Sequence, residues 1–348
     1  MRQVMALIIF ILTCQCIPLG LTELVHANQD PSNIEEAFFS YLTDMKNPPA
    51  LIDYSPSDFD PRRGKNFHLP SALSIEKDLR KLRQVFDGLI VYSYHPEVTP
   101  IVLKKAKELD YQAVVLGIWN AQSKHEMHGV IKLIHQYGHD MALALCLGNE
   151  GLYWNRYTTK DLEEAQASIR AALHQGFQIP ITTSEPASSY RNSLLYSFGD
   201  FLAPNIHPVW EKPALPAKDA VFWTRNQAIS LMEKSQRPVL VKETGFPHSG
   251  ERHFTPQGQK KFWDMYVTEE RLVYSQNSPQ LWVSFASSFE AFSLPWKAEQ
   301  SGEPIEAAWG LMSKDRVPYP AFYTWGQAQG SVVETKGTRS TLSHIRTR

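Results

Sequence analysis

The stretch "PVLVKETGFP" at residues 238–247 places a glutamate, Glu243, directly after a run of apolar residues. Val239, Leu240 and Val241 follow one another without a polar residue between them, so both faces of an extended chain are apolar here. Such a run is typical of a strand in a parallel sheet that helices cover on both sides. Glu243 is then either a surface carboxylate at a strand end or a member of a functional site.

Seven other apolar runs occur along the chain, and amphipathic stretches separate them. These runs are "ALIDYSP" from Ala50, "LIVYSY" from Leu89, "AVVLGIW" from Ala113, "MALALCLGNE" from Met141, "IPITTSEP" from Ile179, "FLAPNIHP" from Phe201 and "QLWVSFASSFEAF" from Gln280. Eight strands that alternate with helices predict an α/β fold, a single (β/α)8 barrel. A doubly wound sheet is the alternative, but no glycine-rich phosphate loop follows any run.

The separating stretches carry the apolar period of helices. Helices are predicted near residues 71–88, 97–109, 124–137, 157–177, 218–235 and 256–277. In the fourth of these, Thr159 is placed to cap the start of the helix.

The two ends of the chain differ from this alternating part. Residues 1–27 begin with a basic residue, continue as an apolar stretch and end in small residues, so we predict an export signal cleaved before Asn28. An uncleaved anchor and a lipoprotein attached through Cys14 are the weaker alternatives. The barrel domain is then expected over residues 28–330, and residues 331–348 form a polar, basic tail. The protein is expected to be exported, either secreted or periplasmic.

Composition narrows the set of partners. The 348 residues are 43% hydrophobic, which is enough for a large core, and their net charge of -1 indicates neither nucleic acid nor an anionic membrane as a partner. Cys146 alone remains after removal of the predicted signal, so the mature chain cannot form an internal disulfide. We expect a monomer that, after signal cleavage, contacts no membrane.

A barrel gives Glu243 a functional meaning, because barrel active sites lie at the C-terminal ends of the strands. Glu150, in "LGNE", ends the fourth predicted strand, and Glu243 ends the seventh. The two carboxylates can therefore face each other across the barrel mouth. Carboxyl groups about 5–5.5 Å apart make a retaining glycosidase pair, whereas about 6.5–9.5 Å makes an inverting one.

Motifs at successive strand ends carry a family resemblance. They are "YSP" at 54–56, "LGIWN" at 116–120, "GNE" at 148–150, "TTSEP" at 182–186, "NIHPVWE" at 205–211, "KETGFP" at 242–247, "FEAFSLPWK" at 289–297 and "EAAWGLM" at 306–312. In this order they resemble glycoside hydrolase family 17, the β-1,3-glucanase family of clan A retaining glycosidases. "KETGFP" is similar to the family's nucleophile motif, "GETGWP".

The resemblance implies roles for three residues. Glu243 would be the nucleophile and Glu150 the general acid/base of a covalent mechanism. Asn149, directly before the acid/base, would bind the sugar 2-hydroxyl. The implied substrate is β-1,3-glucan or a related β-glucan, and no cofactor is implied.

Further residues at strand ends and in the following loops are candidate substrate contacts. The aromatic members could stack on the apolar faces of pyranose rings or pack in the core, and the charged members could touch the sugar or orient the two carboxylates. The full set is Asn149, Tyr54, Tyr92, Trp119, Glu185, His207, Trp210, Trp296, Lys297 and Glu306.

One loop departs from the family pattern. The family has "FDEPWK" where this chain has "FSLPWK", so Ser293 and Leu294 replace two acids. Lys297 would lose a partner there, and Glu290 is a candidate substitute. Three hypotheses stay open: hydrolysis of β-glucan, transglycosylation through the same intermediate, and glucan binding with weak catalysis.

Histidine spacing gives no support for a metal centre. His125 and His128 are three residues apart around Glu126, whereas the zinc motif H-E-x-x-H needs a spacing of four. His135 and His139 have that spacing without the glutamate. We predict no catalytic metal.

Overall fold

The computed structural model describes residues 34–62, 67–173, 177–212 and 215–328. These residues belong to one compact unit. The predicted signal at 1–27 and the predicted tail at 331–348 lie outside the described residues, so both, and the domain limits 28–330, stay predictions. Within the described part, no helix is both long and apolar enough to cross a bilayer.

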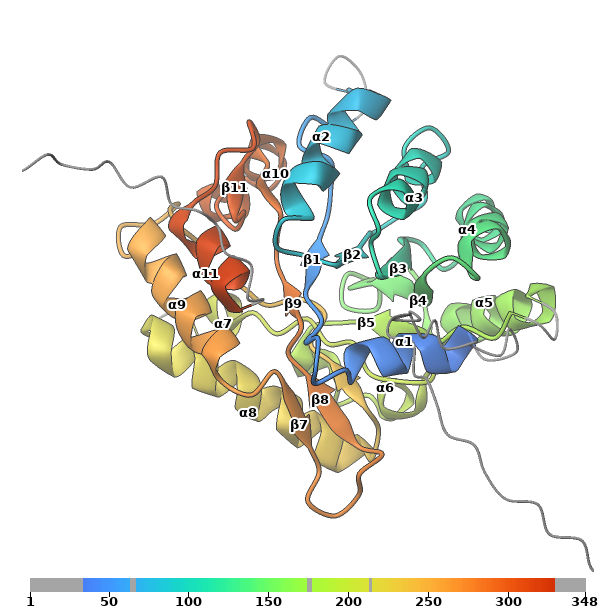
Figure 1. The fold of residues 1–348 in the computed structure, drawn as a ribbon. Helices are drawn as coiled ribbons and strands as arrows, with labels where there is room; N and C mark the ends of the chain where they lie inside the picture. The colour runs from blue at the N-terminus through green and yellow to red at the C-terminus, as the bar shows by residue number, and fades with distance from the viewer. Residues whose placement is uncertain (1–33, 63–66, 174–176, 213–214, 329–348) are drawn as a thin grey trace, which may run out of the picture. The chain divides into compact units, whose positions relative to one another are not determined.

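Six strands form one parallel sheet (Figure 1). Its order is β5-β4-β3-β2-β1-β9. The strands are β1 (Leu51–Asp53), β2 (Gly88–Ile90), β3 (Ala113–Ile118), β4 (Ala142–Asn149), β5 (Ile181–Ser184) and β9 (Ser287–Ser288).

The sheet closes into a ring through the segments that lie between β5 and β9. Parallel bridges join Pro186 to Asn205, and Asn205 to Glu243. β6 (Val239–Leu240) then pairs in parallel with β8 (Trp282–Ser284), which leads into β9. The predicted barrel is therefore confirmed, although its sixth strand consists of isolated bridges. Pro204 lies within that segment and has no N–H to donate to a ladder.

The predicted helices surround the strands (Figure 1). They are α2 (Ala72–Leu82), α3 (Thr99–Glu108), α4 (Lys124–Tyr137), α5 (Thr159–Ala172), α8 (Ala217–Ser235) and α9 (Pro256–Thr268). Shorter helices occupy the loops: α6 (Ser193–Ser197), α7 (Pro208–Glu211), α10 (Pro295–Ser301) and the 3-10 turns η2 (Ala187–Ser189) and η3 (Pro304–Ala307). The last described helix, α11 (Pro320–Ala328), packs against α9. β10 (Phe292–Ser293) pairs with β11 (Met312–Ser313).

Two local predictions were wrong. The helix predicted over 256–277 ends at Thr268, and β7 (Leu272–Tyr274) follows it and pairs antiparallel with β8. The cap of α5 is Thr158, not Thr159. Thr158 and Asp161 form a capping box, in which each side chain accepts a hydrogen bond from the other residue's backbone N–H.

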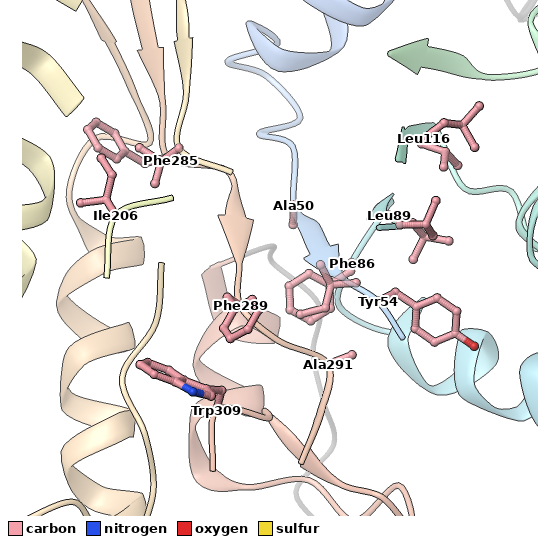
Figure 2. Close-up of a cluster of buried hydrophobic side chains, with 14 of the residues drawn as sticks. Ala50, Tyr54, Phe86, Leu89, Leu116, Ile206, Phe285, Phe289, Ala291 and Trp309 are labelled. Atoms are coloured by element: carbon pink, nitrogen blue, oxygen red, sulfur yellow. The ribbon is translucent and has the colours of Figure 1, made fainter. Parts of the chain in front are cut away.

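Successive strand residues divide between two apolar clusters, as period-two alternation requires. Side chains such as Ile52, Leu89 and Leu116 belong to the large cluster, which also contains the buried helix faces. Figure 2 shows part of this cluster, with Leu89 and Leu116 beside Tyr54 and Phe86.

The second cluster fills the inside of the ring. We call its strand residues the apolar layer: Leu51, Ile90, Val115, Cys146, Ala203, Leu240 and Ala286. Helix α1 (Ile34–Leu42), which the sequence reading did not predict, closes its N-terminal side. Phe38 of α1 is fully buried in this cluster, with its ring 5.9 Å from that of Phe201.

Two residues further along the same inward faces, the side chains become polar. We call this set the polar layer: Asp53 after Leu51, Tyr92 after Ile90, Asn205 after Ala203, and Lys242 after Leu240. The polar layer therefore lies toward the C-terminal ends of the strands, where barrel active sites are built.

Candidate active site

A cleft of about 1550 Å³ opens where the strands end. Most of the predicted site residues line it, although they come from segments far apart in the sequence. They are Tyr92, Trp119, Asn149, Glu150, His207, Trp210, Glu243, Trp296, Lys297 and Glu306.

Glu243 is a buried carboxylate with a cation on one oxygen and an imidazole on the other. Lys242 Nζ donates to Glu243 Oε1 at 2.6 Å, and His207 Nε2 lies 3.2 Å from Oε2. Burial alone would raise the pKa of Glu243, but Lys242 and His207 outweigh it and lower the pKa to about 2. Glu243 is therefore an ionised carboxylate held at the floor of the cleft.

Glu150 leaves the strand through a tight turn. Gly148 has a φ of 87°, and a Cβ there would lie 2.0 Å from Tyr157 Oη, so only glycine fits. Glu150 itself has a φ of 54°, and its N–H donates to the carbonyl of Ser184 at 2.7 Å. This turn takes the Glu150 side chain off the barrel wall and into the cleft.

A chain of hydrogen bonds connects the two carboxylates. Asn205 Nδ2 donates to Glu150 Oε1 at 2.9 Å and to Asn149 Oδ1 at 3.2 Å. Lys242 Nζ donates to the same Asn149 oxygen at 2.9 Å and to Glu243. Because both donors meet Oδ1, the Asn149 amide nitrogen keeps its protons for a ligand in the cleft.

Lys242 and Asp53 are ionisable residues of the site that the sequence analysis did not predict. Asp53 Oδ1 accepts from Tyr92 Oη at 2.9 Å, and the Lys242 ammonium lies 4.4 Å from the centre of the Tyr92 ring. Burial raises the pKa of Asp53 well above its usual range, with Lys242 opposing. Both residues could have been found as an ionisable residue within an apolar strand, in "LIDYSP" and in "VLVKE".

Glu185 differs from the expectation that it contacts substrate. It is fully buried and lies outside the residues that line the cleft. Its two oxygens accept from the N–H groups of Leu152 at 2.9 Å and Tyr153 at 3.1 Å. Glu185 therefore anchors the loop that follows Glu150.

Tyr54 also lies outside the cleft lining. Its hydroxyl donates to Asp78 Oδ2 at 3.1 Å, and the same carboxylate accepts from the backbone and side chain of Ser57. Tyr54 is thus a buried structural residue that ties β1 to α2.

Exposed aromatic rings project into the cleft. Trp119 and Trp210 are 38% and 46% exposed, as the sugar-stacking prediction requires. Tyr153 and Trp154, which the sequence reading missed, are 53% and 62% exposed, and Trp154 Nε1 donates to Glu150 Oε2 at 3.3 Å. Their signal was the aromatic pair in "GNEGLYW", directly after the predicted acid/base.

The altered loop keeps a carboxylate for Lys297. Lys297 Nζ donates to Glu290 Oε2 at 2.5 Å. Burial raises the pKa of Glu290 to about 7, although Lys297 lowers it. Leu294 is buried, and Ser293 Oγ lies 2.9 Å from His248 Nε2, so both replacements belong to the interior.

Glu306 and the remaining tryptophan complete the wall on the side of Lys297. Burial raises the pKa of Glu306, with Lys297 and His207 opposing. Trp296 is half-buried and packs against the core. Among the described residues, no three His, Cys, Asp or Glu side chains are grouped to hold a metal ion.

Comparison with known proteins places this site in a family. Residues 52–310 match the family described as BtgE/BtgC glycoside hydrolase domain. The chain is 22% identical over 219 residues to a glucan 1,3-beta-glucosidase of Schizosaccharomyces pombe, covering 59% of this chain and 65% of that protein. It is 24% identical over 237 residues to a glucan 1,3-beta-glucosidase of Arthroderma benhamiae, covering 63% of this chain and 73% of that protein. The chain thus spans less than two thirds of the first relative's length.

Solved structures share the barrel. An active-site mutant of Rhizomucor miehei beta-1,3-glucanosyltransferase in complex with laminaritriose superposes with a TM-score of 0.60 and 19% identity, over 78% of this chain and 96% of that one. A second structure of the Rhizomucor miehei enzyme, described as glycoside hydrolase family 17, gives a TM-score of 0.58, 18% identity and the same coverage. The resemblance predicted from the strand-end motifs is confirmed.

Proposed function

The chain belongs to the BtgE/BtgC glycoside hydrolase family, and from this premise we propose that it cleaves β-1,3-glucan with retention of configuration. The observation that carries the proposal is the pair Glu150 and Glu243, which line one cleft and are joined through Asn205, Asn149 and Lys242. The linkage follows the names of the relatives, which are glucan 1,3-beta-glucosidases.

The two carboxylates divide the reaction into two displacements. In the first, a Glu243 oxygen attacks the anomeric carbon while Glu150 gives its proton to the glycosidic oxygen, which departs as a hydroxyl. In the second, Glu150 takes a proton from water, the water oxygen attacks the same carbon, and the bond to Glu243 breaks. Glu243 suits the role of nucleophile because it is ionised and buried. Glu150 suits the role of acid and base because it is accessible in the cleft.

The Asn149 amide supports both displacements. Its nitrogen is free to donate to the 2-hydroxyl of the sugar bound to Glu243, a bond that strengthens as the ring gains oxocarbenium character. Lys242 and Asn205 hold the amide oxygen, so the donor is oriented before the sugar arrives.

The test is product analysis with a soluble β-1,3-glucan, using protein purified as the cell produces it. Glu243→Gln should lower kcat on the order of ten-thousandfold. Glu163→Gln, an exposed glutamate of α5, is the matched control and should leave kcat unchanged.

Azide separates the two roles on an activated aryl β-glucoside. With Glu243→Gly, azide should attack directly and give the α-glucosyl azide. With Glu150→Gly, it should attack the covalent intermediate and give the β-glucosyl azide. Full activity of Glu243→Gln, or tight glucan binding by the unaltered protein without any turnover, contradicts the proposal.

Transglycosylation through the same intermediate is the second candidate, and the position of Trp154 favours it. The leaving sugar must lie beside Glu150, which protonates it, and Trp154 presents an exposed ring at that carboxylate. A sugar stacked on this ring can replace water as the acceptor. Trp154→Ala should lower the ratio of lengthened products to hydrolysis products, whereas Phe222→Ala, an exposed aromatic outside the cleft, should not.

The site of action is proposed to lie outside the cytoplasm, with the protein acting as a monomer. The support is the predicted signal at residues 1–27, which has a basic start, an apolar stretch and small residues before Asn28. N-terminal sequencing of the protein from the medium or periplasm should begin at Asn28, and its mass in solution should be that of one chain. Uncleaved protein that begins at Met1 and stays in the membrane fraction would contradict the predicted cleavage and release.

A further inference from the structure

The residue before the nucleophile is a lysine in this chain and a glycine in the family motif to which it is similar. Lys242 stands in "KETGFP" where the motif reads "GETGWP". The residue is 1% exposed, and its side chain lies on the inward face, two residues beyond Leu240 of the apolar layer. An ammonium inside a barrel costs several kcal/mol unless the surrounding groups compensate it, so its contacts need an explanation.

The contacts of Lys242 reach two of the residues that act on the substrate. Its Nζ donates to Glu243 Oε1 at 2.6 Å and to Asn149 Oδ1 at 2.9 Å. The ring of Tyr92 lies 4.4 Å from the ammonium, and the hydroxyl of Tyr92 is bonded to Asp53. Burial alone would lower the pKa of Lys242, but Glu243 and Asp53 outweigh it and raise the pKa, so the residue stays cationic.

Lys242 reaches Glu243 and Asn149 from inside the barrel. Lys242 is buried and does not line the cleft, so its ammonium lies out of reach of the substrate. It acts through Glu243, Asn149 and the ring of Tyr92, from below the floor of the site. This separates its role from those of His207 and Asn205, which line the cleft themselves.

We propose that Lys242 is a positioning residue of the reaction: from inside the barrel its ammonium fixes the Glu243 carboxylate and the Asn149 amide together and stabilises Glu243 as the departing carboxylate. The inference rests on the proposed function, with Glu243 as nucleophile. When the intermediate breaks, the electron pair of the glycosyl–oxygen bond returns to Glu243. A donor already at hydrogen-bond distance stabilises this charge without reorganisation.

The second displacement is therefore the step that depends most on Lys242. Without the ammonium, the carboxylate leaves less readily, so the glycosyl-enzyme should accumulate. The acid limb of kcat/KM should also move to higher pH, because Glu243 would lose a cation that keeps it ionised. A Lys242 variant retains the other ionisable groups that act on Glu243, which are His207, Tyr92, Cys146, Asp53, Glu290 and Glu306. Among them, Asp53 and Cys146 also lose the cation that lowers their pKa.

The experiment compares the unaltered protein with Lys242→Met and with Lys242→Gly, which removes the side chain altogether. The substrate is an aryl β-glucoside whose first displacement is fast. Lys242→Met should lower kcat about a hundredfold, with a burst of released phenol and a glucosyl adduct in the intact-protein mass spectrum. Methylammonium should restore part of the activity of Lys242→Gly and move its acid limb back toward lower pH.

Three results would overturn the inference. One is a Lys242→Met enzyme with the kcat and acid limb of the unaltered protein. Another is a Lys242→Met enzyme that loses activity but shows neither the glucosyl adduct nor a shift of the acid limb of kcat/KM, as expected for a purely structural residue. The third needs no variant: an acid limb of the unaltered protein at or above pH 4.5, where it remains folded. Each leaves the proposed function standing as long as Glu243→Gln is inactive, and an active Glu243→Gln would overturn the proposed function itself.

Discussion

The two ends of the barrel interior are built by the same strands and differ in almost every physical property. Leu51 and Leu240 belong to the apolar layer, and Asp53 and Lys242, two residues later on the same faces, belong to the polar layer. Two residues along a strand is about 7 Å. Over that distance the interior changes from a sealed core to a network of charges that supports the cleft.

The difference also appears in how well polar atoms are satisfied. Among the described residues, the buried atoms without a hydrogen-bond partner include Asp53 Oδ2, Ser288 Oγ, Glu290 Oε1 and His207 Nδ1. These atoms belong to the polar layer or to residues close above it. Water or a bound sugar can reach such atoms from the cleft and supply the missing partner. The apolar layer, by contrast, consists of side chains that need no hydrogen-bond partner.

The largest effect is expected when a lysine replaces a residue of the apolar layer. Leu240→Lys places an ammonium among Leu51, Ile90 and Ala203, with no acid in the layer to receive it. We expect loss of more than about 5 kcal/mol of unfolding free energy, from the buried ion and the lost leucine together. Urea denaturation checks this, with Leu240→Met as the control of similar volume. If Leu240→Lys were as stable as the control, position along the strand would not decide where charge is tolerated.

Opening the apolar end should damage stability and leave catalysis intact. Phe38→Ala removes the buried ring that α1 packs near Phe201, and we expect a loss of about 3–5 kcal/mol. The kcat of the folded fraction should be unchanged, because α1 is absent from the cleft lining. Thermal unfolding and assays well below the midpoint measure both quantities. A large fall in kcat with the fold intact would show that the two ends are coupled.

The polar end should make stability depend on pH. Glu290 holds its proton more tightly in the folded state, where its pKa is about 7, than in the unfolded chain, where it is about 4.5. Between these values the folded state binds more protons, so stability should fall as pH rises. Glu290→Gln should flatten this slope without abolishing it, because burial also raises the pKa of Asp53 and Glu306. Unfolding midpoints from pH 4 to 8 test this, and an unchanged slope would contradict it.

The smallest effect is expected at the rim of the cleft. Arg156 stacks 4.0 Å from the centre of the Trp119 ring and holds it in place. Trp119→Ala should weaken glucan binding by about 1 kcal/mol, a roughly fivefold rise in KM, with little change in stability. Phe222→Ala is the control, since Phe222 is exposed to a similar degree and has Lys218 over its ring outside the cleft. Equal effects of both changes would remove Trp119 from the binding surface.

The sequence was sufficient to predict the barrel and the placement of Glu150 and Glu243 in one cleft, because apolar runs with a glutamate at their ends are local patterns. It was insufficient for Glu185 and Tyr54, whose strand-end positions do not reveal which way each side chain points once the chain bends. Lys242 and Asp53 were visible as charges within apolar runs, but their partners come from other strands. Helix α1 was not predicted because its partners, such as Phe201, come from distant parts of the chain and meet it only in the folded ring.

The position of α1 has a consequence for the order in which the protein folds. The first described helix packs its rings against Phe201 and Trp282, which belong to much later parts of the chain. Contacts between the beginning and end of a chain form late and slow the folding of a domain. The barrel cannot be sealed until nearly the whole chain has been made. In a chain exported as proposed above, the N-terminal end of the barrel would stay open until the segment with Trp282 has followed α1 across the membrane.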